Sequence, residues 1–140
     1  RRGFNIDSLA VGTTNDETVS RMTIVVNGDD YIVDQVSKQL NKLIDVIKIK
    51  LLKEDETVSR ELALIKVEAD SKTRSNIIQI VDIFRANIID VSHKTITIEI
   101  TGSSDKLQAI VDLLSPYGIR EIVKTGMISI ERGINIIEKK

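Results

Sequence analysis

The sequence predicts an α+β protein in which two related halves each combine a β-sheet with helices. Segments whose apolar residues alternate with period two are interspersed with segments of helical period. Both halves present their elements in the same order, which indicates an internal repeat. Isoleucine and valine, whose branched side chains suit strands, account for 24 and 13 of the 140 residues, so we expect a protein rich in sheet.

Several segments alternate as strands with one buried face do. In residues 95–101 every isoleucine falls on one face, and threonine or glutamate falls on the other. Residues 46–51 repeat this pattern with lysines outward, and residues 127–130 repeat it once more. Residues 21–27 and 61–69 are apolar on both faces, which is expected of interior or interface strands.

Three other segments carry the apolar stripe of a helix. Asp29 or Asp30 can cap the first helix, Ser103 or Ser104 can cap the second, and the third starts at about Ser71. Pro116 and Gly118 then stop the helix that follows Ser103. The expected inward-facing residues are Ile32, Val36, Leu40 and Leu43; Leu107, Ile110, Val111 and Leu114; and Ile77, Ile80, Val81 and Phe84.

The two halves also align with each other. Residues 23–30 match residues 97–104, and residues 5–9 match residues 87–91. The second half has the order strand, helix, strand, strand, helix, strand, which is the ferredoxin-like βαββαβ order. We therefore expect two ferredoxin-like domains of related structure.

The strand and helix of residues 60–86 have no counterpart before Asn5. We therefore expect a first domain that lacks its initial strand and most of its first helix, with roughly 25 residues preceding it in the natural protein. The apolar surface left exposed there would need a partner chain, or the domain would be unstable. The expected organisation is an incomplete N-terminal domain at 1–52, a linker at 53–59, a second domain at 60–131 and a tail at 132–140.

Composition excludes several classes of function. Lys and Arg total 20 against 21 Asp and Glu, so the net charge of −1 provides no basic field for nucleic acid or anionic lipid. Cysteine is absent, which excludes disulfides, thiolate nucleophiles and structural zinc clusters of cysteine. No stretch approaches the ~20 apolar residues of a membrane span, and there is no secretory signal, so we expect a cytoplasmic protein.

Few residues are arranged for catalysis. The single histidine, His93, is interpreted as a solvated residue of a hairpin turn, and the acidic run 54–56 as a solvated linker. Arg74 and Arg85 are expected to decorate the third helix. An RNA-recognition module would share the order of elements, but its central strands need aromatic residues for base stacking, and here they carry Thr, Val and Ile.

One short segment has two interpretations. Residues 3–9 leave a helix through Gly3 and enter a strand through Asn5. Asn5 can cap the C-terminus of that helix. Its amide can equally offer both a donor and an acceptor to a zwitterionic ligand.

Blocks of sequence along nearly the whole chain, the tail excepted, carry a family resemblance. They are residues 2–6, 8–12, 20–26, 38–46, 60–67, 84–91 and 120–126. In these blocks the chain resembles the small regulatory subunit of acetolactate (acetohydroxyacid) synthase. The resemblance implies an N-terminal ACT domain followed by a second, ACT-like ferredoxin domain.

The resemblance also implies a function. The chain would be a non-catalytic subunit that binds valine, or another branched-chain amino acid, and confers feedback inhibition on a catalytic subunit that it also activates. It would form a homodimer through its ACT domains, in the cytoplasm or in the plastid of a plant or alga. Thiamine diphosphate, magnesium and FAD would belong to the catalytic subunit. An assembly module without effector sensing remains an alternative. A small ferredoxin-fold hydrolase is disfavoured, because no loop of this sequence offers a convincing phosphate-binding site.

In this family the effector lies between two ACT domains, where an Asn-x-x-Pro-Gly loop of one subunit meets a Gly-Phe-Asn-Ile segment of its neighbour. The second element is present here as Gly3, Phe4, Asn5 and Ile6. The resemblance implies that Asn5 hydrogen-bonds the ammonium or carboxylate of the ligand and that Ile6 makes an apolar contact.

The loop element does not occur in this sequence. Pro116 is the only proline, and the corresponding residues of the second half, 70–74, hold no Pro-Gly pair. We therefore assign no effector site to the second domain. We expect the loop to lie upstream of residue 1 and the present chain alone to bind valine poorly.

Overall fold

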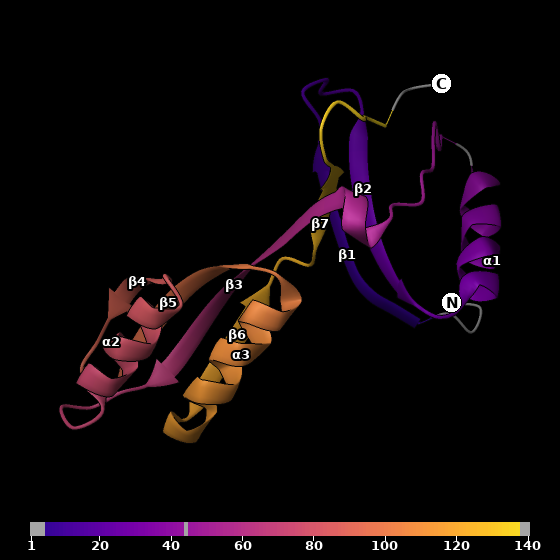
Figure 1. Cartoon of the computed structure of the whole chain (residues 1–140). Coiled ribbons are helices and arrows are strands. Elements are labelled where there is room, and N and C mark those ends of the chain that lie inside the picture. Colours follow the sequence, from indigo (N-terminus) through magenta and orange to yellow (C-terminus); the bar gives the residue numbers. More distant parts are fainter. Residues whose placement is uncertain (1–4, 44, 138–140) are drawn as a thin grey trace. The chain divides into compact units, whose positions relative to one another are not determined.

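The chain folds into two compact units. The computed structural model describes residues 5–43 and 45–137 (Figure 1). The first unit comprises the residues up to Ser59 and those from Met127 onward, and the second unit comprises residues 60–126. No helix in the described ranges is long and apolar enough to cross a membrane.

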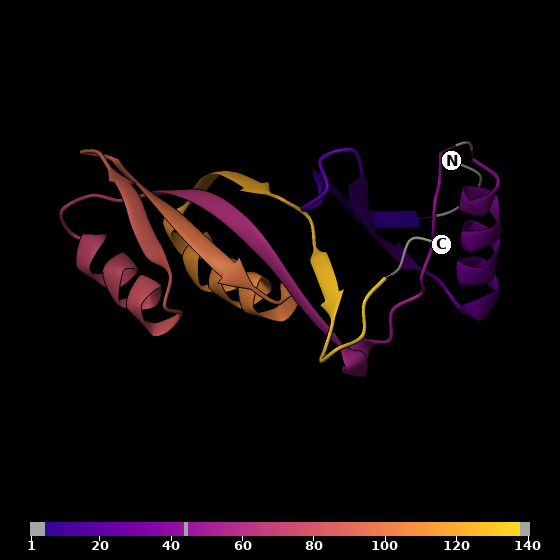
Figure 2. The same cartoon turned by 90° about the horizontal axis from the view of Figure 1, so that it is seen from above.

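The second unit is a four-stranded antiparallel sheet with two helices. The sheet has the order β4-β5-β3-β6, so β3 and β5 are central. Both helices lie on one face of it (Figures 1 and 2). This arrangement confirms the predicted ferredoxin-like order. Its elements are β3 (Thr57–Glu68), α2 (Arg74–Ile83), β4 (Asn87–Val91), β5 (Thr95–Gly102), α3 (Ser104–Leu114), the 3₁₀ turn η2 (Ser115–Tyr117) and β6 (Ile119–Lys124).

The core of this unit lies between the helices and the facing side of the sheet. The alternating isoleucines of β5, predicted to share one face, are fully buried there. The stripes of α2 and α3 are confirmed as well, with Val111, Ile80 and Phe84 packed at the margin. Leu43, predicted to face inward in the first helix, lies beyond the end of that helix at Asn41 and is 56% exposed. The buried core residues are Ala63, Ile65, Val67, Ala69, Ile77, Val81, Ile96, Ile98, Ile100, Leu107, Ile110 and Leu114.

Residues 61–69 were predicted as an interior or interface strand, and β3 is indeed interior to the sheet, but it is buried on one face only. From Ala63 onward β3 strictly alternates buried and exposed residues, because helices cover only one side of the sheet. On the open side Lys66 lies 3.9 Å from Glu121, measured from Nζ to the carboxylate, and Glu68 pairs with Arg120 at 2.7 Å. A central strand therefore needs apolar residues on both sides only where both sides are covered.

The first unit contains a hairpin, one long helix and a short returning strand. The hairpin pairs β1 (Asn5–Thr13) with β2 (Ser20–Asn27), and α1 (Asp30–Asn41) follows. The 3₁₀ turn η1 (Glu54–Glu56) precedes β3. The strand β7 (Ile128–Glu131) pairs with β3, and the Arg132 amide donates to the Glu56 carbonyl at 2.9 Å. The residues expected to form a linker thus hold η1 and the start of β3, where Thr57 is buried.

Residues 46–51 do not form the predicted strand. The chain is irregular from Val46 to Lys53, and within the described ranges no strand pairs with it. Alternation of side chains describes a face, but a strand also needs a neighbour to take its backbone hydrogen bonds. Residues 127–130 do contain a strand, but its partner is the beginning of β3 in the first unit.

Apolar side chains of the first unit are poorly covered. Among its described residues only Thr57, 7% exposed, is buried. The exposed large apolar residues of this unit are Ile6, Leu9, Val11, Met22, Tyr31, Leu43, Val46, Ile47, Leu51, Ile128, Ile130, Ile134 and Ile136. The expectation of an exposed apolar surface in this half is confirmed.

The predicted repeat is visible in local geometry. Asp29 and Ser103 each cap the helix that follows, accepting from the amide three residues on. The glycine before each capping residue has no room for a side chain. A Cβ on Gly28 would lie 2.7 Å from the Ile32 side chain, and one on Gly102 would lie 2.5 Å from that of Lys106. Each half thus uses a glycine and a capping residue to turn from a strand into a helix.

Adjacent leucines at the end of α3 allow a matched test of the core. We expect Leu114→Ala, at a fully buried position, to destabilise the second unit by about 2–5 kcal/mol because it leaves a cavity. Leu113 is 49% exposed, and we expect Leu113→Ala to cost about 1 kcal/mol or less. Urea unfolding of both variants measures the difference. Equal losses of stability would contradict the placement of the core.

Candidate functional site

The predicted effector segment lies at the beginning of the hairpin. Gly3 and Phe4 lie outside the described residues, so the structure does not test the prediction that Asn5 caps a preceding helix. Asn5 opens β1 and is paired with Asn27 through its backbone, and Ile6 is paired with Val26. The ladder places Asn5 and Ile6 where β2 ends and the turn into α1 starts. The two site residues inside the described ranges are thus adjacent on one strand.

A β-bulge follows immediately. The register of the hairpin shifts between Ile6 and Ser8, so that Asp7 has no direct partner on β2. The hairpin of the second unit shifts in the same way, between Ile88 and Asp90. A bulge bends the strand and increases its twist, so it changes the direction of the residues beside it. The Ile6 side chain next to the bulge is 52% exposed.

The hairpin presents an open edge and an apolar face. In the part of the chain that the structure describes, β1 pairs with β2 alone, so its other edge has free backbone groups. Leu9, Val11 and Met22 are half-exposed, and the pairing of Val11 with Met22 sets them on one face of the hairpin. An open edge next to an apolar face is characteristic of a protein interface.

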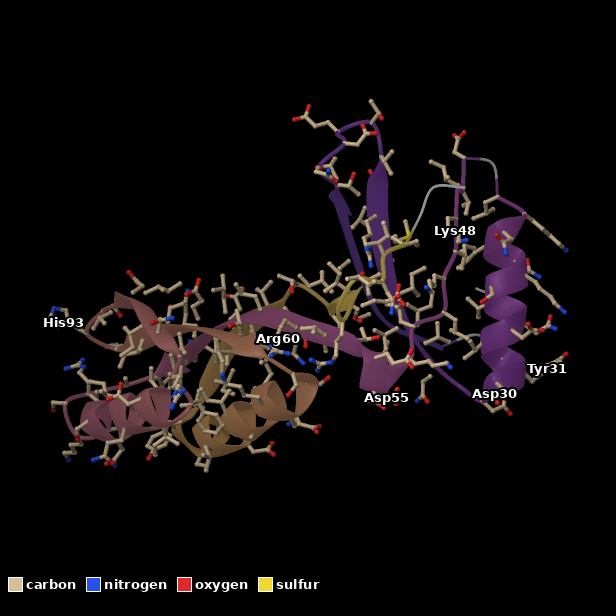
Figure 3. The ribbon with its side chains drawn as sticks, turned by 45° about the horizontal axis from the view of Figure 1, so that its top comes forward. Asp30, Tyr31, Lys48, Asp55, Arg60 and His93 are labelled. Carbon is tan, nitrogen blue, oxygen red and sulfur yellow. The ribbon has the colours of Figure 1, made fainter. Side chains whose placement is uncertain are left out.

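The start of α1 adds polar groups close to this end of the hairpin. Of the two predicted caps, Asp29 is the one that acts, since its carboxylate accepts from the Ile32 amide at 3.0 Å. Asp30 occupies the first turn, where a negative charge complements the helix dipole. Figure 3 shows Asp30 and Tyr31 at this first turn, with their side chains directed away from the helix. Capping by Asp29 and the helix dipole at Asp30 explain both aspartates without a ligand.

Residues 70–74 of the second unit, which correspond to the Asn-x-x-Pro-Gly loop of the family, form a turn that is closed by its own side chains. Asp70 accepts from the amides of Lys72 at 2.9 Å and Thr73 at 3.0 Å, and the Thr73 hydroxyl accepts from the Asp70 amide. The backbone hydrogen bonds from Thr73 and Lys72 lower the pKa of the Asp70 carboxyl. This turn also explains why the helix predicted from about Ser71 begins only at Arg74.

The lone histidine lies at the tip of the β4–β5 hairpin. His93 is exposed and points away from the strands (Figure 3), in agreement with its interpretation as a turn residue. The carbonyls of Ser92 and His93 accept from Arg74 Nη2 at 3.4 and 3.3 Å, so Arg74 joins the hairpin to the start of α2 instead of only decorating it. Together with Val91 these residues line a shallow depression. Within residues 5–43 and 45–137, no three His, Asp or Glu side chains are grouped so as to hold a metal ion.

Comparison with known proteins connects both units to one family. A family model described as "AHAS small subunit-like ACT domain" matches residues 1–48, and one described as "Small subunit of acetolactate synthase" matches residues 60–133. The chain belongs to the acetolactate synthase small subunit family. The acetolactate synthase small subunit of Mycolicibacterium smegmatis is 58% identical over 133 residues, which cover 95% of this chain and 78% of that protein.

More distant members of the acetolactate synthase small subunit family are also similar along most of the chain. The probable acetolactate synthase small subunit of Archaeoglobus fulgidus is 53% identical over 95% of this chain and 83% of its own length. The crystal structure of the small subunit from Thermotoga maritima matches with a TM-score of 0.87 at 42% identity, over 96% of this chain and 84% of that one. The family resemblance and the ACT-type α+β fold are confirmed.

Membership of this family identifies the general role of the chain. The chain is a small, regulatory type of subunit of acetolactate synthase, with a role in branched-chain amino acid biosynthesis. A small subunit implies a catalytic subunit as partner.

Two features of the structure were missed at the level of sequence. The closed turn at Asp70 had a local signal, since an aspartate three residues before a threonine is a common turn pattern. The polar contacts of β7 had no local signal in the sequence. One of them joins Arg21 to Ser129, which are 108 residues apart.

The Asp70 turn generates a pH prediction. We expect the Asp70 carboxyl to titrate below its ordinary value of 3.8 in an NMR titration of the folded chain. Because its pKa is lowered by folding, its contribution to stability is present above the ordinary value and is lost as the pH falls through the folded-state pKa. Asp70→Asn should remove that part of the acid dependence. A carboxyl that titrates at or above 3.8 would contradict the hydrogen-bonded turn.

Proposed function

We propose that this chain binds valine, or another branched-chain amino acid, at an interface between two ACT domains, and that it thereby confers feedback inhibition on acetolactate synthase. The effector residues are Gly3, Phe4, Asn5 and Ile6. The observation that carries the proposal is the position of Asn5 and Ile6 at the start of an open edge strand, within the range that the ACT-domain model matches.

The chemistry of this segment suits an amino acid ligand. An asparagine amide is both a donor and an acceptor, so Asn5 can bind either the ammonium or the carboxylate of the effector. The half-exposed Ile6 offers apolar surface to a branched side chain, and covering that surface favours binding. Asn5 would thus bind a charged end of a branched-chain amino acid, and Ile6 would contact its apolar side chain.

A homodimer through the ACT domains would complete the site. Pairing at the free edge of β1 would extend the sheet across two chains and would satisfy the backbone groups of that edge. A ligand held between the chains stabilises the arrangement that binds it. Feedback inhibition then requires only that the catalytic subunit distinguishes the two arrangements, by about 1–3 kcal/mol of coupling.

The chain would be non-catalytic and would activate its partner. Thiamine diphosphate, magnesium and FAD would reside on the catalytic subunit, where the reaction takes place. The residue types here support this division, since the whole sequence has one histidine and no cysteine.

A second candidate function is assembly without effector sensing. The exposed apolar face of the hairpin favours it, because such a surface can hold subunits together without any ligand. The two functions differ in their dependence on Asn5.

An alanine substitution separates these candidates. In the holoenzyme formed by the natural gene product and the catalytic subunit, we expect Asn5→Ala to raise the valine concentration for half-inhibition by about tenfold or more. The reason is that a hydrogen bond to a charged ligand group contributes about 1.5–3 kcal/mol.

The measurement is the acetolactate synthesis rate as a function of valine concentration, with size-exclusion chromatography to show that the complex still forms. Asn15→Ala, in the exposed turn of the same hairpin, is the matched control and should leave the valine response unchanged. An unaltered valine response of Asn5→Ala would contradict the proposed role of Asn5 and would favour assembly without sensing, or an effector site elsewhere.

A further inference from the structure

A group of polar contacts holds β7 in the first unit. Arg21 Nη2 donates to the Ser129 carbonyl at 2.9 Å, and the hydroxyls of Ser59 and Ser129 are 2.7 Å apart. Lys50 Nζ lies 3.1 Å from Glu131 Oε2. We refer to these five residues as the clasp. Through it β7 contacts β2, the irregular segment after α1, and the start of β3.

Apolar burial contributes little to this attachment. Ile128 and Ile130, the apolar residues of β7, are more than half exposed. In the described part of the first unit only Thr57 is buried. The position of β7 therefore depends mainly on its backbone pairing with β3 and on the clasp.

One polar atom of Glu131 lacks a hydrogen-bond partner in the described part of the chain when β7 is attached. Its side chain is only 10% exposed, and Oε2 is paired with Lys50. The other oxygen, Oε1, is buried and has no hydrogen-bond partner among the described residues. A buried carboxylate oxygen without a partner is unfavourable, and release of β7 would return it to water. The return of this oxygen to water would offset part of the cost of releasing β7.

We propose that the clasp is a regulatory device, in which attachment of β7 to the hairpin sets the response to the effector. This inference rests on the proposed function. Arg21 connects β7 to β2 at the end of the ladder where Arg21 is paired with Gly12. The same ladder continues to its other end, where Asn5 of the effector segment is paired with Asn27. An effector that fixes the hairpin favours attached β7. Attached β7 favours effector binding to the same extent, because the coupling between two equilibria is reciprocal.

A charge exchange tests the clasp. Lys50→Glu and Glu131→Lys each place like charges together and release β7. In the holoenzyme we expect each to raise the valine concentration for half-inhibition by about threefold or more. The double variant, which restores an ion pair of opposite polarity, should return this concentration to within about twofold of wild type. Lys48→Glu is the matched control, since Lys48 is exposed in the same irregular segment (Figure 3) and should leave the valine response unchanged.

A measurement on the unaltered protein keeps the test independent of folding defects in the variants. We expect valine to slow amide hydrogen exchange at Ser129 and Ile130 by about threefold or more in the wild-type holoenzyme. The amides of Thr97 and Glu99, in a central strand of the second unit, serve as the reference. A purely structural clasp would stabilise β7 without this dependence on valine.

The outcomes distinguish the two proposals. Unchanged valine inhibition in Lys50→Glu, or β7 exchange that ignores valine, overturns the inference if Asn5→Ala still weakens inhibition. If neither Asn5→Ala nor Lys50→Glu alters the valine response, the proposed function fails, and the inference fails with it. Weakened inhibition in both single charge variants, with rescue in the double variant, supports the clasp.

Discussion

Coverage of an apolar sheet face is the constraint on which this protein depends. In the second unit α2 and α3 lie over the face that carries the isoleucines of β5, and a buried core results. The first unit has a similar strand-to-helix turn at Gly28 and Asp29, yet its apolar side chains remain exposed. The difference between a self-sufficient domain and one suited to an interface thus lies in how much of the sheet is covered, rather than in the turn chemistry.

Features fixed by neighbouring residues could be predicted from sequence. The buried isoleucines of β5, the helical stripes and the caps at Asp29 and Ser103 follow from spacing and local hydrogen bonding. Features that need a distant partner could not. Residues 46–51 alternate like a strand but have no neighbour to pair with. The strand over residues 127–130 was predicted, but its pairing with the start of β3 was not, because alternation carries no information about the partner.

The candidate site divides along the same line. That Asn5 enters a strand could be predicted, because glycine and asparagine before an apolar segment are local signals. The bulge at Asp7 and the free edge of β1 depend on register and on what lies alongside, which one strand cannot specify. The loop before α2 has no counterpart in the described part of the first unit, and Asp70 closes it by accepting from the amides of that same loop.

The order of the chain through the two units has a consequence for biosynthesis. The second unit, residues 60–126, is inserted within the first, whose last strand follows it. A ribosome that adds about 5–20 residues per second takes several seconds to synthesise residues 60–126. During this time the hairpin and α1 have been synthesised but β7 has not. The inner unit can fold as soon as β6 emerges. The outer unit is completed only afterwards, when β7 emerges and can pair with the start of β3.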